Sequence, residues 1–142
     1  MSWIAKVTSI DSTSRVGGYA GQVVLARDYL RALRVRRPAA AALDHLLSGV
    51  DALAAPTLPT VAWRVDLAPD QAHLEFPGGT SVAGAANLCG VPALFLMNGT
   101  GEAGLPTSLQ LTGRALSEAT LLAIGMHYQA RTKFHRQRPP GL

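Results

Sequence analysis

Apolar residues first recur with a helical period from Gln22 onward. The apolar positions spaced three and four apart are Val23, Ala26, Leu30 and Leu33. Arginines follow the same spacing on another side, so the pattern predicts an amphipathic helix. Because proline removes a backbone hydrogen bond, this helix is expected to end before Pro38, which suits the first turn of a second helix. The sequence therefore predicts a helical hairpin.

The second predicted helix leads into a strand. Its expected buried stripe consists of Leu43, Leu46, Leu47 and Val50. Gly49 is expected to end the helix. The short apolar run 50–55, stopped by Pro56, is typical of a buried strand.

Further elements are predicted from Thr80 onward. Thr80 or Ser81 can cap a short helix that reaches Leu88. This helix is expected to bury Val82, Ala85 and Ala86, and Gly90 and Pro92 end it. The runs 93–97 and 108–112 predict two strands, joined by a connection at 98–104 whose glycines permit positive backbone angles.

A last helix is expected after Ser117, a good N-cap residue, and it should fray near Lys133. Its expected packed stripe consists of Leu121, Leu122, Ile124, Gly125 and Tyr128. Three segments lack a clear period: residues 1–21, the irregular loop 60–78, and the tail 135–142, which is expected to be loose and basic.

The composition indicates how much of the surface is covered and in which compartment the chain is expected. Hydrophobic residues make up 48% of the chain and charged residues 15%, against about a quarter charged in average globular chains. This balance indicates extensive covered surface. The single cysteine, Cys89, excludes an internal disulfide, and no signal peptide or membrane span is recognisable. The expected location is the cytoplasm, with no membrane partner.

The basic residues leave two interpretations open. The formal net charge is +4, and all 13 basic residues except Lys6 and Lys133 are arginine. The two clusters are Arg27, Arg31, Arg34, Arg36 and Arg37, and Arg131, Lys133, Arg136 and Arg138. Such clusters can attract phosphate, but no aromatic residues are spaced to stack on bases. A solvated helix face is therefore favoured over a nucleic-acid surface.

Several motifs occur in a recognisable order. They are Tyr29-Leu30-Arg31-Ala32, the run 51–57 that ends in Pro56-Thr57, and the stretch 80–114 with Asn87, Gly90-Val91-Pro92, a Gly-rich loop and Gln110-Leu111-Thr112-Gly113-Arg114. Together they resemble the C-terminal part of the amidase signature family, serine hydrolases of carboxamides that include one component of the amidotransferases. The resemblance covers residues 22–134. It implies an α/β fold with helices packed on a small mixed sheet, as a C-terminal portion of the family fold.

The catalytic half of that family has no counterpart in this sequence. In the family a serine attacks, a second serine on a cis peptide relays its proton, and a buried lysine is the base, supported by a Gly- and Ser-rich stretch. The nearest glycine cluster here, residues 17–21, contains no serine. Neither Lys6 nor Lys133 has the expected surroundings of a buried base. We therefore expect a truncated or split amidase, inactive alone, with no catalytic residue of its own.

The sequence gives little support for a metal site or a cofactor site. The four histidines are His45, His73, His127 and His135, and no pair has the spacing of a metal site. We expect no metal and no cofactor. By the resemblance, Thr80, Asn87 and Gln110 lie close to the substrate cleft. Thr80 could instead be only a helix cap, Asn87 could bond local backbone, and Gln110 could satisfy a neighbouring backbone group.

The predicted sheet is expected to be incomplete and to associate with a partner. An isolated sheet of this kind presents an unpaired edge and an apolar face, which proteins cover by association. The expected partner is a second copy of the chain or a complementary N-terminal half. Two alternatives stay open: a non-catalytic module that binds an anionic partner through the arginine face, and a fragment of a longer gene product.

Overall fold

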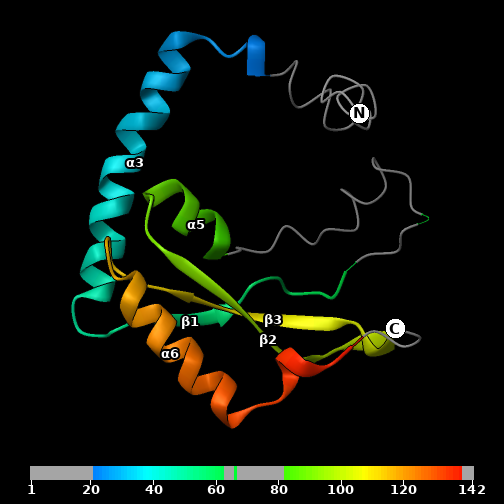
Figure 1. Cartoon of the computed structure of the whole chain (residues 1–142). Helices are drawn as coiled ribbons and strands as arrows, with labels where there is room; N and C mark the ends of the chain where they lie inside the picture. Colours follow the sequence, from blue (N-terminus) through cyan, green and yellow to red (C-terminus); the bar gives the residue numbers. More distant parts are fainter. Residues whose placement is uncertain (1–20, 63–65, 67–81, 139–142) are drawn as a thin grey trace, which may run out of the picture. The chain divides into compact units, whose positions relative to one another are not determined.

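The computed structural model describes residues 21–62, 66 and 82–138 (Figure 1). The chain forms two compact units. The first comprises Met1–Arg34 and Trp63–Pro77, and the second comprises Val35–Ala62 and Gly78–Leu142. All the described strands, and every described helix from the second half of α3 onward, belong to the second unit.

Helix α3 spans Ala26–Leu47 as one element, so the predicted helical hairpin is wrong. Pro38 lies inside the helix and cannot donate to the carbonyl of Arg34. An interior proline costs about 3 kcal/mol relative to alanine. The alanines and leucines that follow favour the helix and offset part of this cost. The helix ends as predicted before Gly49, where the Ser48 hydroxyl donates to the carbonyl of His45 at 2.7 Å.

The predicted stripes of α3 are only partly buried. Leu43 and Leu47 are buried as expected, whereas Leu46 is 64% exposed and Val50 is also exposed. The expected stripe of the first half is exposed at Val23, Ala26, Leu30 and Leu33. Helical spacing thus predicted the helix correctly but not how far its apolar side would be covered.

Three strands form an antiparallel sheet in the order β1-β3-β2. They are β1 (Leu53–Pro56), β2 (Ala93–Thr100) and β3 (Pro106–Thr112). The predicted strands at 93–97 and 108–112 are confirmed and extend further toward their connection. The run 50–55 forms a strand only from Leu53, and this strand includes Pro56 and alternates between partly buried and exposed residues, so the expected buried strand ending before Pro56 is wrong. That connection contains the 3₁₀ turn η1 (Glu102–Gly104), in which Ala103 and Gly104 adopt positive φ. An irregularity in the ladder lies between Met97 and Gly99.

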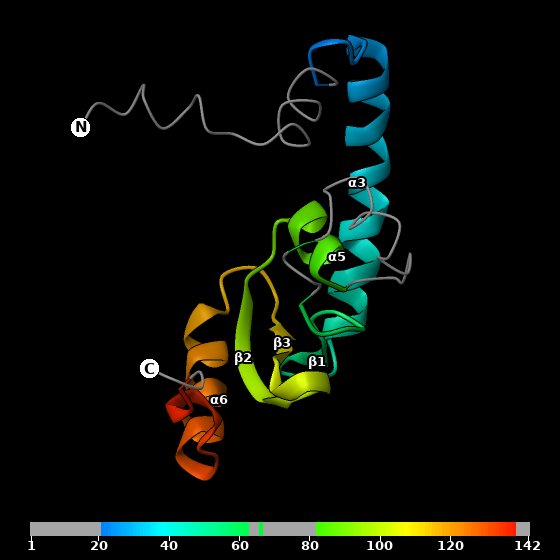
Figure 2. The ribbon, with the colours of Figure 1, turned by 90° about the vertical axis from the view of Figure 1, so that its right-hand side faces the viewer.

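Helix α6 (Glu118–Arg131) packs on one face of the sheet (Figure 2). The buried core consists of Leu96, Leu111 and Leu121, with partly buried Ala52, Leu94, Leu109, Ile124 and Tyr128 around it. Gly125 lets the helix approach closely, since a Cβ there would meet Leu94 Cδ2 at 2.6 Å. The predicted stripe is confirmed except at Leu122, which is 56% exposed.

Ser117 is the N-cap residue of α6 but does not cap it with its side chain. Its hydroxyl donates to the carbonyl of Arg114 at 2.7 Å instead. The expected side-chain cap is therefore wrong, because the preceding turn offers a competing acceptor.

Helix α5 (Val82–Cys89) contacts β3 and lies on the other side of the sheet from α6 (Figure 2). It confirms the predicted short helix. Of the residues expected to be buried, Ala86 is buried, Ala85 is exposed, and the side chain of Val82 is outside the described part. Gly90 ends it with φ of 72°, donating its N–H to the carbonyl of Ala86 at 2.9 Å. Thr80 and Ser81, the predicted caps, lie outside the described residues.

After α6 the chain turns back along the sheet. The 3₁₀ turn η2 (Phe134–Arg136) lies beside β2, so the segment expected to be loose from residue 135 begins with an ordered turn. Within the described ranges, no helix is long and apolar enough to cross a bilayer.

Candidate functional site

Gln110 and Thr112 form a buried polar pair on β3. They are two residues apart and so share one face of the strand. The Gln110 side chain is 0% exposed and its Nε2 donates to Thr112 Oγ1 at 2.9 Å. Gln110 Oε1 is buried and has no hydrogen-bond partner among the described residues. A buried acceptor without a partner costs about 1–3 kcal/mol, which makes this amide an unusual feature of a small core.

The three residues expected near the substrate cleft have different surroundings. Gln110 is fully buried between Ala55 of β1 and Phe95 of β2. Asn87 is exposed on α5, and Thr80 lies outside the described residues. The structure therefore does not bring Asn87 and Gln110 to one solvent-facing surface.

Thr112 was missed by the sequence interpretation. It is 1% exposed and is the hydrogen-bond partner of Gln110. The signal was present in the alternation Gln-Leu-Thr, which places two polar side chains on one face of a strand.

A polar hollow of about 340 Å³ lies where α3 ends and α6 begins. Its lining consists of Ser48, Gly49, Val50, Asp51, Arg114, Ser117 and Thr120. The hydroxyls of Ser48 and Ser117 donate to the carbonyls of His45 and Arg114. Arg114 forms an exposed ion pair with Asp44 at 3.4 Å. Hydroxyls that donate to backbone carbonyls are turn formers, and no base among the described residues activates them.

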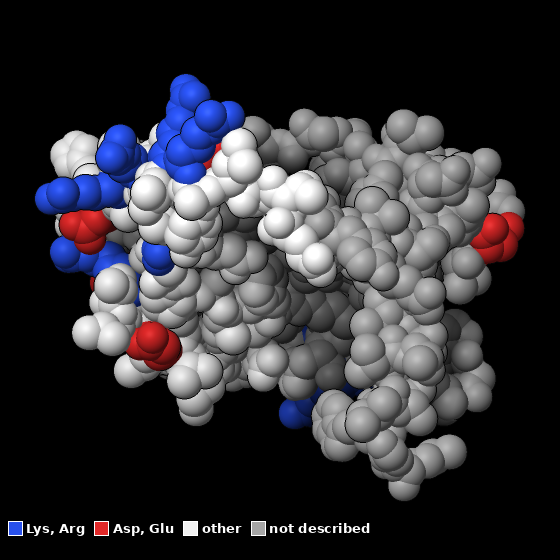
Figure 3. Space-filling model, turned by 90° about the horizontal axis from the view of Figure 1, so that it is seen from above, with Lys and Arg blue, Asp and Glu red and all other residues white. Residues whose placement is uncertain are grey.

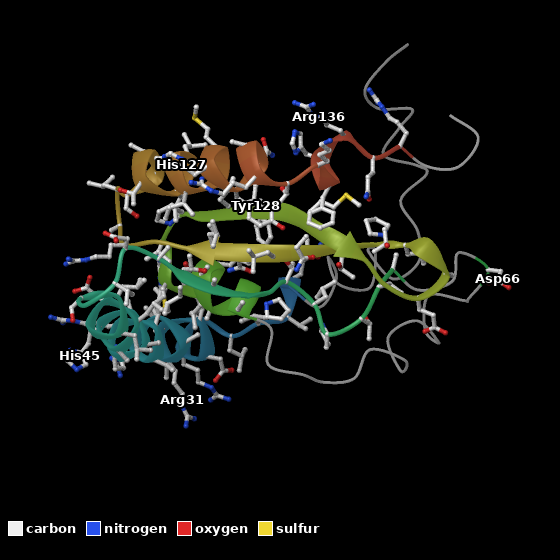
Figure 4. All side chains as sticks on the ribbon, turned by 90° about the horizontal axis from the view of Figure 1, so that it is seen from below. Arg31, His45, Asp66, His127, Tyr128 and Arg136 are labelled. Carbon is white, nitrogen blue, oxygen red and sulfur yellow. The ribbon has the colours of Figure 1, made fainter. Side chains whose placement is uncertain are left out.

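The described histidines do not assemble a site. His45 lies on α3, His127 on α6 and His135 in η2, and His73 is outside the described ranges. Figure 4 shows His127 and Tyr128 on α6, with Tyr128 directed toward the sheet. In the part of the chain that the structure covers, no three His, Cys, Asp or Glu residues come together as metal ligands. Cys89, partly buried at the end of α5, is a free thiol.

The family follows from comparison with known proteins. A family model for amidases matches residues 8–122. The A component of the glutamyl-tRNA(Gln) amidotransferase of Chloroflexus aurantiacus is 41% identical over 111 residues, which are 78% of this chain and 22% of that protein. The corresponding protein of Moorella thermoacetica is 38% identical over 112 residues, 78% of this chain and 22% of that protein.

Solved structures give the same result. A crystal structure of an amidase superposes with a TM-score of 0.69 at 27% identity, covering 87% of this chain and 29% of that one. The native peptide amidase of Stenotrophomonas maltophilia gives a TM-score of 0.55 at 33% identity, covering 76% of this chain and 21% of that one.

The chain belongs to the amidase signature family. The resemblance read from its motifs is confirmed, as is the expected α/β fold with helices on a small sheet, whose described strands all pair antiparallel. The chain spans about a fifth of the length of the curated relatives it matches.

Proposed function

We propose that this chain supplies the C-terminal scaffold of an amidase-signature hydrolase that cleaves a carboxamide, and that it is inactive without the remaining part. The observation that carries the proposal is the family match over residues 8–122 in a chain that spans only 22% of a relative. The absence of the Gly- and Ser-rich nucleophile stretch from its sequence supports the inactivity. Amide hydrolysis needs an activated nucleophile and fixed donors for the oxyanion.

The role proposed for the residues near the cleft rests on the family resemblance. Thr80 and Asn87 are proposed to line the substrate side, and the exposure of Asn87 supports this for one of them. Gln110 is proposed to lie on the strand that borders the cleft, where its side chain is fully covered in this chain and bonds to Thr112 of the same strand. No residue of this chain is proposed to attack the amide.

The partner and the location of the chain are also proposals. The complementary part would come from a separately encoded half or from the rest of a longer product, and self-association of the chain is the other arrangement. The cytoplasm is proposed because the composition includes a single cysteine, which fits a reducing compartment.

A chimera tests the proposed function. The 111-residue matched segment of the Chloroflexus aurantiacus relative would be replaced by the aligned residues of this chain. We expect the chimera to hydrolyse a simple carboxamide within about tenfold of the relative, because the exchanged segments are 41% identical. The relative without the segment and the isolated chain should both be inactive.

Two outcomes would reject the proposal. One is a folded chimera that has no amide turnover. The other is an isolated chain that hydrolyses a carboxamide and loses this activity when one of its own hydroxyls is replaced.

A second candidate function is a module that binds an anionic partner. Arginines gather over α3 (Figure 3). Arg27, Arg31 and Arg34 are exposed and lie four and three residues apart on this helix. Of these three, only Arg27 forms an ion pair with a described residue, a long contact of 3.9 Å to Asp28. Exposed arginines at helical spacing favour an anion surface or a solvated face.

Salt dependence separates these two interpretations. If three arginines contact the phosphates of an RNA, its affinity should fall roughly 20- to 40-fold between about 50 and 200 mM salt. Changing Arg27, Arg31 and Arg34 to Gln should remove this dependence. The matched control changes Arg131, Arg136 and Arg138 to Gln, which removes the same charge elsewhere. An equal loss in both variants, or no binding at low salt, would reject the module.

A further inference from the structure

Helix α5 contains no charged residue, as is typical of a buried helix, but several of its side chains are exposed to solvent. The sequence contains no Asp, Glu, Lys, Arg or His from Phe76 to Gly101, a stretch that includes all of α5. A helix without a charged side belongs in the interior of a larger protein. Yet Ala85 is exposed and Leu88 is 48% exposed, while Ala86 is buried. The described part of this chain therefore leaves apolar residues of α5 uncovered, beside the exposed polar residue Asn87.

The sheet face on the α5 side also has an exposed apolar side chain. Phe95 of β2 pairs with Gln110 of β3, and the two side chains point to the same face. This face is the one on the α5 side, because Leu94 and Leu96 alternate with Phe95 and pack toward α6. The Phe95 side chain is 50% exposed. We call Ala85, Leu88 and Phe95 the α5 surface.

We propose that the α5 surface is the docking surface for the part of the amidase fold that this chain lacks, an inference that rests on the proposed function. The chain spans 22% of a curated relative and 29% of a solved amidase, so most of the family fold lies outside it. Cores of protein interfaces are depleted in charged residues, as this stretch is. A nucleic acid would require basic side chains, which α5 does not have.

The exposed outer side of α6 provides a matched control. Leu122 is 56% exposed and Leu88 is 48% exposed, on helices that lie on opposite sides of the sheet. The same substitution can therefore be placed on either side at similar exposure. Because both side chains already contact water, Leu88→Glu and Leu122→Glu should leave the folding of the isolated chain unchanged, as judged by circular dichroism and thermal unfolding.

The test uses the full chain, co-expressed with the Chloroflexus aurantiacus relative from which the matched segment has been deleted. We expect the wild-type chain and Leu122→Glu to co-purify with it and to restore amide turnover within about twofold of each other. Leu88→Glu should reduce both by at least about tenfold, because it buries an unpaired carboxylate. The single thiol, Cys89 at the end of α5, should also react with maleimide at least about tenfold more slowly in the complex, as followed by intact mass.

Each other result overturns the inference in an identifiable way. Wild-type complementation together with equal complementation by Leu88→Glu rejects the α5 surface and leaves the proposed function standing. Failure of the wild-type chain both to bind and to restore turnover rejects both. If Leu88→Glu converts a dimer of the chain to a monomer, the occupant is a second copy. If Leu88→Glu lowers the thermal stability of a monomeric chain, the occupant is another segment of the chain itself.

Discussion

At the scale of single residues, the pair Gln110 and Thr112 is the most informative. Each side chain is buried, and their mutual hydrogen bond satisfies one amide hydrogen while Gln110 Oε1 lacks a described partner. Buried polar groups are tolerable when they are paired and costly when one partner is removed. The pair should therefore respond unequally to single and double substitutions.

A double-mutant cycle tests this. Thr112→Val leaves Gln110 Nε2 unpaired and should lower the free energy of unfolding by about 1–3 kcal/mol. The double variant Gln110→Leu with Thr112→Val removes both partners and should be nearly neutral or stabilising. Urea unfolding of Thr112→Val, Gln110→Leu and the double variant gives the values. A double variant that is less stable than Thr112→Val would contradict the assignment of Gln110 Oε1 as unpartnered.

A second residue pair distinguishes the two sides of α6. Leu121 is 2% exposed in the core, whereas its neighbour Leu122 faces outward. Leu121→Ala should lower the free energy of unfolding by about 2–5 kcal/mol through the cavity it creates. Leu122→Ala should change it by less than about 0.5 kcal/mol in the isolated chain. Comparable effects in thermal unfolding would mean that α6 is rotated relative to the sheet.

At the scale of elements, sequence periodicity predicted where helices and strands occur better than it predicted what covers them. The strand pair around the Gly-rich connection was recognisable because 93–97 and 108–112 are short apolar runs with turn residues between them. The helical hairpin was predicted wrongly because proline usually breaks a helix, whereas the strong helix formers on both sides of Pro38 keep α3 continuous. The burial of Gln110 was not recognisable, because alternation in β3 does not say which face a second helix will cover.

Replacement of the interior proline of α3 should stabilise the helix. Pro38→Ala restores a donor for the Arg34 carbonyl and should stabilise the helix by up to about 3 kcal/mol. The control is Val35→Ala at an exposed position of the same helix, where the gain should be about 0.5 kcal/mol. Far-UV circular dichroism during thermal unfolding measures both. A less helical Pro38→Ala variant would show that the proline is needed for the native path of α3.

At the scale of the whole molecule, the buried core is small, while many large apolar side chains are exposed. Exposed side chains include Leu30, Leu46, Leu88, Phe95, Leu116, Leu122 and Met126. Those of the second unit are distributed over both sides of the sheet, and of these Leu88 and Phe95 belong to the proposed α5 surface. Under the proposed function, the lack of a nucleophile stretch and the exposed apolar residues have one explanation, a scaffold that is completed by another part of the family fold.

Stability should accordingly depend on the complement. If the relative without its matched segment binds only the folded chain, an amount equal to about 100 times the dissociation constant adds about 2.7 kcal/mol to the free energy of unfolding. The melting temperature of the chain should rise with the concentration of that protein. The Leu88→Glu variant serves as the control and should show no rise. A melting temperature that does not change for the wild-type chain would contradict this expectation.

The pairing of β1 with β3 also constrains how the chain reaches its native state. Leu53 and Thr112 are neighbours in the sheet although most of the chain's middle separates them, whereas β2, β3 and α6 follow one another directly. During synthesis on a ribosome, β1 emerges well before the strand that accepts it. We therefore expect β1 to pair after the hairpin of β2 and β3 has formed, and we expect closure of this long loop to be slower than formation of the local contacts.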